Sequence, residues 1–395
     1  MKTNKEVVKL TQKHVAQTYR RFPIALVRGK GTKVWDASGN SYTDFVAGLA
    51  ADNLGHCHPN LVKAIRTQAG RLLHVSNLYH IEPQSELAQE LTQCSFADKV
   101  FFCNSGTEAN ESAIKLARRF FHDQGEKGRY EIIAMKNSFH GRTMGSLSAT
   151  GQDKFHTGFK PLLPGFKFIP FNNIRAAEKA VSSKTCAILV EPVQGEGGVN
   201  LGDKNYFKGL KRICKANNIL LIFDEVQTAF GRTGTLFAYE RLGIKPDIIT
   251  LAKALGGGVA IGAMAASNRL MKSLIPGTHA ATFGGNPLAC AAGLASVRTI
   301  KKTAFLKQCQ EKGKYFYSRL KGLRFSVIKE VRGVGLMLAI ELNKPGAEVV
   351  LDCMRQGFLI NCIQQNILRF TPPLIITKKE IDNLIKALSI SLEKL

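Results

Sequence analysis

The sequence has no apolar run long enough to cross a membrane and no CxxC pair. A membrane helix needs about 18 consecutive apolar residues, so we expect no contact with a membrane. The N-terminal stretch MKTNKEVVKLTQKHV lacks the apolar core of a secretory signal. The nine cysteines are odd in number and scattered, several of them inside apolar runs. This pattern predicts reduced thiols in a cytoplasmic protein and no disulfide framework.

Basic residues are in excess, yet they form no run. Lys and Arg number 55 against 30 Asp and Glu, a net charge of +25. Basic pairs such as Arg20-Arg21 and Lys378-Lys379 are separated by ordinary sequence, and aromatic residues do not alternate with them as in single-strand binders. We therefore expect no nucleic-acid partner. The charge is expected to attract anionic small molecules.

Short apolar runs in the middle of the chain predict buried parallel strands. They cover residues 99–103, 131–135, 186–192, 219–225 and 247–252. Stretches with helical spacing, such as 108–123 and 203–218, lie between them. This alternation predicts an α/β fold, a mostly parallel sheet with helices on both faces.

The two ends of the chain differ from the middle. Residues 38–40 (SGN) separate two strand-like runs and predict a hairpin turn. Residues 325–342 read as antiparallel strands, and a Thr377–Glu380 capping box predicts the start of a last helix. We expect a large domain at 46–295 and a small α+β domain built from 1–45 and 296–395.

A polar cluster follows each of the five predicted strands. The clusters are NSGTEAN, NSFHGR, EPVQGEGG, DEVQ and Lys253. Ligands of open parallel sheets bind beyond the carboxyl ends of the strands. The sequence therefore predicts one site where the five clusters converge.

The cluster Ser105-Gly106-Thr107 precedes a predicted helix that has Glu108 in its first turn. Glycine allows close approach of the backbone, and a helix start offers free N–H groups to a phosphate. A simple N-cap formed by Thr107 explains the same residues equally well. The cluster alone does not separate these two interpretations.

Asp224 ends an apolar run, where a carboxylate requires a cation or a donor. A metal ligand and a solvated strand end are the alternatives, but no HExxH or similar spacing lies nearby. His56, Cys57 and His58 offer no second ligand pair, so a turn is favoured there and no metal is expected.

Lys253 closes the last apolar run and is followed by Ala-Leu-Gly-Gly-Gly. A partly desolvated lysine loses its proton easily and attacks carbonyl carbons. A lysine that extends from a strand end into solvent is the alternative.

Ordered motifs along almost the whole chain resemble one family. They are GKGTKVWDASGNSYTDFVAG, LGHCHP, FCNSGTEANESAIKLAR, FHGRT, EPVQGEGGV, FDEVQTAFGRTG, PDIITLAKALGGG, TFGGNPLACAAG, RGVGLMLAIEL and LRFTPPL. With these motifs the chain resembles the class III aminotransferases of the fold-type I pyridoxal-phosphate enzymes. The resemblance implies pyridoxal 5'-phosphate as cofactor and a homodimer with active sites at the subunit interface.

The resemblance also implies roles for the cofactor-binding residues. Lys253 would bind the cofactor covalently, and Asp224 would hold its pyridine nitrogen protonated. The other expected cofactor ligands are Ser105, Gly106 and Thr107 at the phosphate, Phe139 and Val226 on the ring faces, Gln227 at the ring hydroxyl oxygen, and Thr282 at the phosphate of the neighbouring subunit's cofactor.

On the substrate side the resemblance implies two carboxylate binders. Arg142 would hold the α-carboxylate and Arg369 the second carboxylate of glutamate or 2-oxoglutarate. Glu196 would pair with Arg369 when the amino donor has no carboxylate at that end. Tyr19 would line the substrate pocket.

Three positions depart from the family pattern. Ala260 stands at a usual proline, Ala280 at a glycine and Ala281 at a serine that contacts substrate. The implied donor is the terminal amine of N-acetylornithine, with 2-oxoglutarate as acceptor. Ornithine, succinylornithine, 4-aminobutyrate and succinyl-diaminopimelate stay open as donors, and a basic nucleic-acid-binding protein on the same fold is a distant alternative.

Overall fold

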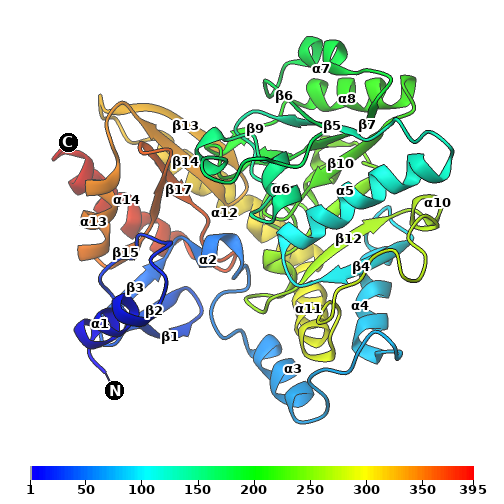
Figure 1. Ribbon diagram of the computed structural model, residues 1–395. Coiled ribbons are helices and arrows are strands. Elements are labelled where there is room, and N and C mark those ends of the chain that lie inside the picture. Colours follow the sequence, from blue (N-terminus) through cyan, green and yellow to red (C-terminus); the bar gives the residue numbers. More distant parts are fainter. Residues whose placement is uncertain (1) are drawn as a thin grey trace.

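The computed structural model describes residues 2–395 and contains one large sheet and two smaller four-stranded sheets (Figure 1). The large sheet has seven strands in the order β4-β12-β11-β10-β7-β5-β6. Its strands are β4 (Lys99–Cys103), β5 (Glu131–Met135), β6 (Phe166–Ile169), β7 (Thr185–Val190), β10 (Leu220–Asp224), β11 (Ile248–Leu251) and β12 (Gly262–Ala266). Only β12 runs antiparallel to both neighbours. The predicted α/β class is confirmed.

Helices cover both faces of this sheet because alternate strand residues point to opposite sides. On one face Ile132, Leu189 and Ile222 pack with the apolar side of α5 (Gly106–Asp123). On the other face Ile133, Val190 and Phe223 pack with residues of several helices. The helices of that second core are α4 (Glu82–Gln93), α7 (Ile174–Ala180), α8 (Lys204–Ala216), α9 (Ala238–Leu242) and α11 (Pro287–Ile300).

The small sheets are built from both chain ends, which lie together on the left of Figure 1. One contains β1 (Leu26–Lys30), β2 (Lys33–Asp36), β3 (Ser41–Asp44) and β15 (Phe358–Leu359). The other contains β13 (Ile328–Val334), β14 (Met337–Leu342), β16 (Asn361–Ile363) and β17 (Ile367–Phe370). The helices α12 (Thr303–Lys321), α13 (Ala347–Arg355) and α14 (Lys378–Leu392) share one core with them.

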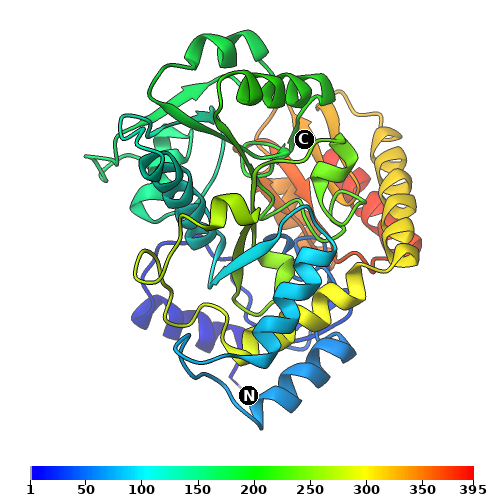
Figure 2. The same cartoon turned by 90° about the vertical axis from the view of Figure 1, so that its right-hand side faces the viewer.

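The remaining elements are short or peripheral. They are α1 (Asn4–His14), α2 (Ala47–Ala50), α3 (Pro59–Ala69), α6 (Met144–Ala149), α10 (Asn268–Met271), the 3-10 turns η1 (Asp153–Phe155) and η2 (Lys253–Leu255), and the pair β8 (Val193–Gln194) and β9 (Asn200–Leu201). The view in Figure 2 shows α3, α4 and α11 stacked on one side of the large sheet.

The local predictions hold at the chain ends. Residues 38–40 form the turn between the antiparallel strands β2 and β3. The strands β13 and β14 are antiparallel, and Thr377 with Glu380 forms the capping box of α14. Separate hydrophobic cores support the division into 46–295 and 1–45 plus 296–395, which we keep as a proposal.

Candidate active site

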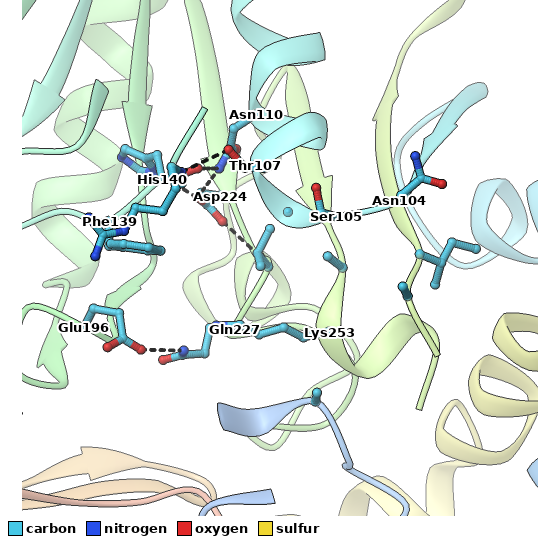
Figure 3. Close-up of a pocket in the computed structure, with 18 of the residues that line it drawn as sticks. Asn104, Ser105, Thr107, Asn110, Phe139, His140, Glu196, Asp224, Gln227 and Lys253 are labelled. Carbon is cyan, nitrogen blue, oxygen red and sulfur yellow. Dashed lines mark hydrogen bonds and ion pairs between the residues drawn. The ribbon is translucent and has the colours of Figure 1, made fainter. Parts of the chain in front are cut away.

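A cavity of ≈420 Å³ opens at the carboxyl ends of the strands of the large sheet (Figure 3). All five polar clusters contribute to its lining. The predicted site residues that line it are Ser105, Gly106, Thr107, Phe139, Arg142, Glu196, Asp224, Val226, Gln227 and Lys253. Ala260, one of the departures from the family pattern, also lines it.

Lys253 lies just beyond β11, as the first residue of the turn η2. Its φ of 46° is in the left-handed region, where a side chain is strained by about 1–3 kcal/mol. Burial lowers the pKa of the Lys253 amine, and the charge of Arg369 acts in the same direction. The carboxylates Glu196 and Asp224 oppose the shift without reversing it. Compared with a solvated lysine, the site therefore shifts Lys253 towards the neutral, nucleophilic amine.

Asp224 ends β10 with only 4% of its surface exposed. Its Oδ2 accepts hydrogen bonds from Asn110 Nδ2 at 2.7 Å and from His140 Nδ1 at 2.8 Å. Its Oδ1 accepts one from the Val226 amide at 3.0 Å. The donors fix the carboxylate at the cavity wall, above the row formed by Lys253, Gln227 and Glu196 in Figure 3.

Asn110 and His140 were not among the predicted site residues. Asn110 donates to both Asp224 and the His140 carbonyl, at 2.7 Å each, and its Oδ1 accepts from Thr250 Oγ1 at 2.8 Å. Asn110 is four residues after Gly106, which places it one helical turn deeper on the same face of α5. A polar residue on the buried face of an amphipathic helix was the available signal.

Glu191 is a second buried carboxyl that sequence reasoning did not select. It accepts hydrogen bonds from the amides of Phe139 at 2.9 Å and Gly195 at 3.2 Å. Burial, together with the charge of Asp224, raises the pKa of Glu191 well above its ordinary value. Its contacts fix the Phe139 backbone at the cavity.

The helix α5 begins two residues earlier than its sequence predicted. Ser105 is its N-cap and accepts from the Glu108 amide at 3.3 Å, so the suggested Thr107 cap is wrong. Thr107 Oγ1 instead accepts from the amides of Arg142 and Thr143, at 3.2 Å each. The first N–H groups of a helix have no partner within the helix, and Gly106 and Thr107 of this first turn line the cavity.

Val226 and Phe139 both line the cavity. A Cβ atom on Gly106 would lie 2.7 Å from a methyl of Val226, so glycine is needed for this close approach. Phe139 packs edge-on against Phe155, and the guanidinium of Arg142 lies 3.9 Å from the Phe155 ring centroid. The cation is thereby held at the mouth of the site.

An ion pair between Glu196 and Arg369 lies at the edge of the cavity. Arg369 Nη1 donates to Glu196 Oε1 at 2.5 Å, and Gln227 Nε2 donates to the same oxygen at 3.3 Å. Burial disfavours the Glu196 charge, but Arg369 and Lys253 outweigh it and hold the pKa of Glu196 below its ordinary value. Arg369 itself is 1% exposed and lies behind Glu196, outside the cavity lining.

Three predicted site residues lie apart from this cavity in the single chain. Tyr19 is 73% exposed, with Arg21 over its ring at 5.3 Å. Thr282 is exposed and Ala281 half-buried, beside an exposed Phe283. Their roles stay predictions.

The His-Cys-His segment has a local explanation. His56 Nε2 lies 2.8 Å from Asp44 Oδ2, which ties this segment to β3. Residues 2–395 contain no group of three or more His, Cys, Asp or Glu arranged to hold a metal ion. No helix in the same range is long and apolar enough to cross a membrane.

Comparison with known proteins gives the same family throughout. The model of the family "Aminotransferase class-III" matches residues 14–392. The chain belongs to the class III aminotransferases. It is 53% identical to the acetylornithine aminotransferase of Caldanaerobacter subterraneus, over 95% of this chain and 96% of that one. The corresponding protein of Methanocaldococcus jannaschii is 51% identical over 96% of each chain.

Solved structures of this aminotransferase family superpose closely. An ornithine aminotransferase from Toxoplasma gondii gives a TM-score of 0.96 at 34% identity, over 100% of this chain and 95% of that one. An acetylornithine aminotransferase from Elizabethkingia anophelis gives 0.90 at 34% identity, with both chains fully covered. The fold is therefore that of these aminotransferases.

The chemistry of the cavity fits the cofactor expected for such an aminotransferase. An aldehyde reacts with the amine of Lys253, and a carboxylate such as Asp224 favours a protonated ring nitrogen. The α5 N-terminus provides N–H groups for a phosphate. Gln227 Oε1 is buried without a hydrogen-bonding partner in residues 2–395, so it is free to accept a hydrogen bond from a ligand.

Proposed function

We propose that this chain transfers the terminal amino group of N-acetylornithine to 2-oxoglutarate with pyridoxal 5'-phosphate as cofactor. The products are N-acetylglutamate semialdehyde and glutamate, a step of arginine synthesis. One observation carries the chemistry. Lys253, with its lowered pKa, lines the same cavity as Asp224 and Glu196, and Glu196 is paired with the buried Arg369 behind it. Identity of about half of all positions to proteins named acetylornithine aminotransferase supports the donor.

The cofactor, when bound, supplies an electron sink that stabilises negative charge on the donor carbon. Asp224 would pair with the ring nitrogen of the cofactor, and Asn110 and His140 hold Asp224 in place. The other residues proposed to bind the cofactor are Ser105, Gly106 and Thr107 at the phosphate, Phe139 and Val226 on the two ring faces, Gln227 at the ring oxygen and Thr282 from the second subunit.

Lys253 is proposed to move the proton. Its Nζ would take a proton from the donor carbon that bears the amino group. It would return that proton to the carbon that receives the amino group. A base works best when its pKa lies near the working pH. Burial moves the pKa of Lys253 in that direction.

The two arginines are proposed to divide the substrates between them. Arg142, fixed over Phe155, binds the α-carboxylate of the donor as a two-point fork. N-Acetylornithine brings no carboxylate toward Arg369, so Glu196 keeps its ion pair. Glutamate and 2-oxoglutarate bring one, and it replaces Glu196 at the Arg369 guanidinium. Tyr19 and Ala281 are proposed to border this pocket in the assembled enzyme.

We further propose a homodimer whose interface contains Thr282. Large apolar side chains are exposed around it, including Leu78 at 84% and Phe283 at 58%. Asn77 Nδ2 donates to the Gly284 carbonyl at 2.8 Å, and His74 packs on Phe283 at 4.8 Å, so the two segments form one surface. Exposed apolar surface of this kind marks association sites. A Leu78→Glu variant should shift the mass in light scattering to a monomer, whereas Leu163→Glu should not.

The cytoplasm is the proposed location. The nine cysteines are all free thiols, and six of them are buried. Unpaired thiols persist in reducing compartments.

Spectral titration of the purified enzyme tests the activity. An absorption band of the bound cofactor is expected, and it should be lost in Lys253→Ala but kept in Lys245→Ala, an exposed lysine elsewhere. N-Acetylornithine should bleach the band far faster than ornithine or 4-aminobutyrate, and 2-oxoglutarate should restore it. A stronger response to ornithine would overturn the donor and keep the aminotransferase. Absence of any band after addition of pyridoxal phosphate would overturn the mechanism.

A further inference from the structure

A basic cavity lies along the C-terminal half of α5, and no function described above uses it. It has a volume of ≈400 Å³ and shares no lining residue with the active-site cavity. Its walls are α5, the loop at 127–130 and the segment 274–278 that follows α10. In Figure 1 this region is at the right, where α5 and α10 lie side by side.

The lining of the basic cavity has one sign of charge. It includes Lys115, Arg118, Arg119, Lys127 and Arg129, and no Asp or Glu. Two carboxylates at its edge partly compensate these cations. Arg119 pairs with Asp123 at 2.6 Å, and Arg129 pairs with Glu126 at 2.8 Å. Five cations against two carboxylates leave an excess of three positive charges.

Arg118 is oriented before any ligand arrives. It is half-buried, and it donates from Nε to the Tyr130 carbonyl at 3.1 Å and from Nη2 to the Pro164 carbonyl at 2.8 Å. Its guanidinium lies 5.5 Å from the Phe166 ring centroid. Burial lowers the pKa of Arg118, and the charge of Glu111 opposes this shift only in part. No carboxylate lies within 4 Å of the Arg118 guanidinium in residues 2–395. These contacts hold the Arg118 guanidinium in one orientation at the cavity wall, and a guanidinium is a charged donor suited to phosphate oxygens.

Lys115 and Lys127 are also without a carboxylate within 4 Å in the described part of the chain. Lys115 Nζ instead lies 2.9 Å from His279 Nδ1. Burial lowers the pKa of His279, and the Lys115 charge adds to the shift, so the ring accepts from the ammonium as a neutral base. Neither lysine is therefore paired with a carboxylate in the described residues.

We propose that the basic cavity binds a small molecule with a chain of phosphate groups. Its volume is within the ~300–1,000 Å³ range of small-molecule sites. Lys and Arg donors at several points of the wall match successive phosphates. Tyr130, with 38% of its surface exposed at the rim, offers a ring face to a nucleobase. Single-stranded nucleic acid fits less well, because it requires several stacking rings along an open groove.

The test is calorimetric titration of the cofactor-loaded enzyme with inorganic tripolyphosphate and, separately, with ATP at low ionic strength. Lys115→Gln/Lys127→Gln removes two uncompensated cations of the basic cavity. Arg241→Gln/Lys314→Gln is the matched control, because it removes the same net charge from a different cavity. Neither pair belongs to the proposed active site.

One ligand per chain is expected, with Kd raised roughly tenfold or more in the Lys115/Lys127 variant and within about twofold of wild type in the control. Equal affinity for tripolyphosphate and ATP identifies the phosphate chain as the determinant. Tighter ATP binding that is lost in Tyr130→Leu identifies a nucleotide. Absence of binding, or an equal loss in both double variants, overturns the proposal. The proposal is also overturned if a short single-stranded DNA binds more tightly than either ligand in all variants.

Discussion

Glu196 Oε1 accepts a hydrogen bond from Arg369 Nη1 at 2.5 Å, at the edge of the cavity that Lys253 faces. Arg369 is almost fully buried, whereas Glu196 keeps a quarter of its side chain exposed. The arginine is therefore the fixed partner and the glutamate the one able to leave. A substrate carboxylate competes with Glu196 for the same guanidinium.

Removal of the Glu196 charge should favour glutamate as donor. In Glu196→Gln the guanidinium of Arg369 loses its anionic partner, so KM for glutamate should fall roughly tenfold, as expected for one charge-assisted hydrogen bond. kcat/KM for N-acetylornithine should change less. Steady-state kinetics with both donors give the ratio of kcat/KM for glutamate to kcat/KM for N-acetylornithine. Glu341→Gln, which breaks an ion pair with Arg332 elsewhere, should leave that ratio as in the wild type.

Asn110 should act on catalysis through Asp224. In Asn110→Ala the Asp224 Oδ2 retains only His140 as a side-chain donor, and loss of a hydrogen bond to a charged group is worth about 1.5–3 kcal/mol. kcat/KM should fall by about ten- to hundredfold, with weaker cofactor retention on dialysis. Asn172→Ala removes amide contacts to Leu201 and Asp203 far from the cavity. An equal loss of activity in that control would argue against a specific role of Asn110.

Glu225 should make stability depend on pH. It is completely buried and accepts from the amides of Ala238 at 2.6 Å and Tyr239 at 2.8 Å, yet burial raises its pKa to about 7. The folded state thus holds a proton that the unfolded chain, with a carboxyl pKa near 4.5, releases. Stability should fall as pH rises from about 4.5 to 7, by about 3 kcal/mol from this group.

Urea unfolding at pH 5.5 and 7.5 measures this dependence. In Glu225→Gln the free energy of unfolding should differ less between pH 5.5 and pH 7.5 than in the wild type. This holds whatever the variant does to stability at a single pH. Some dependence of the same sign should remain, because burial also raises the pKa of Glu191. An unchanged difference in the variant would show that Glu225 is ionised throughout.

Arg232 should be essential for stability. It is fully buried, and its guanidinium donates to the carbonyls of Leu336 at 2.8 Å and Pro372 at 2.6 Å and to Asn53 Oδ1. Arg232→Ala leaves these oxygens without donors, which should lower the free energy of unfolding by about 3–5 kcal/mol. Arg324→Ala, an exposed arginine, should change it by less than about 0.5 kcal/mol. Denaturant unfolding monitored by circular dichroism gives both values.

Apolar periodicity located most of the large sheet but missed one of its inner strands. The strand β12 consists of Gly262, Met264 and three alanines, which carry little strand propensity. It forms because β11 and β4 flank it and small side chains fit between α5 and the opposite core. β6 was also missed, since it is short and lies at the sheet edge.

The convergence of the five clusters followed from topology alone, and the cavity contains residues from each. The supporting polar residues did not follow. Asn110 meets Thr250 of β11 only when α5 packs on the sheet. Glu191 meets the Phe139 amide, which follows a different strand of the sheet, only in the folded chain. Tyr19 and Thr282 are exposed in one chain, so a single folded chain does not define their neighbours.

The position of Arg232 affects how the molecule melts. The core of the large sheet and the core of the small sheets are big enough to unfold in separate steps. Arg232 joins a loop beside the core of the large sheet to carbonyl groups beside the core of the small sheets. Burial lowers the pKa of Arg232 to about 9. If one core opened alone, a charged guanidinium would be left in the other without its acceptors. Both cores therefore belong to one cooperative transition, and a calorimetric trace of the enzyme should contain a single peak.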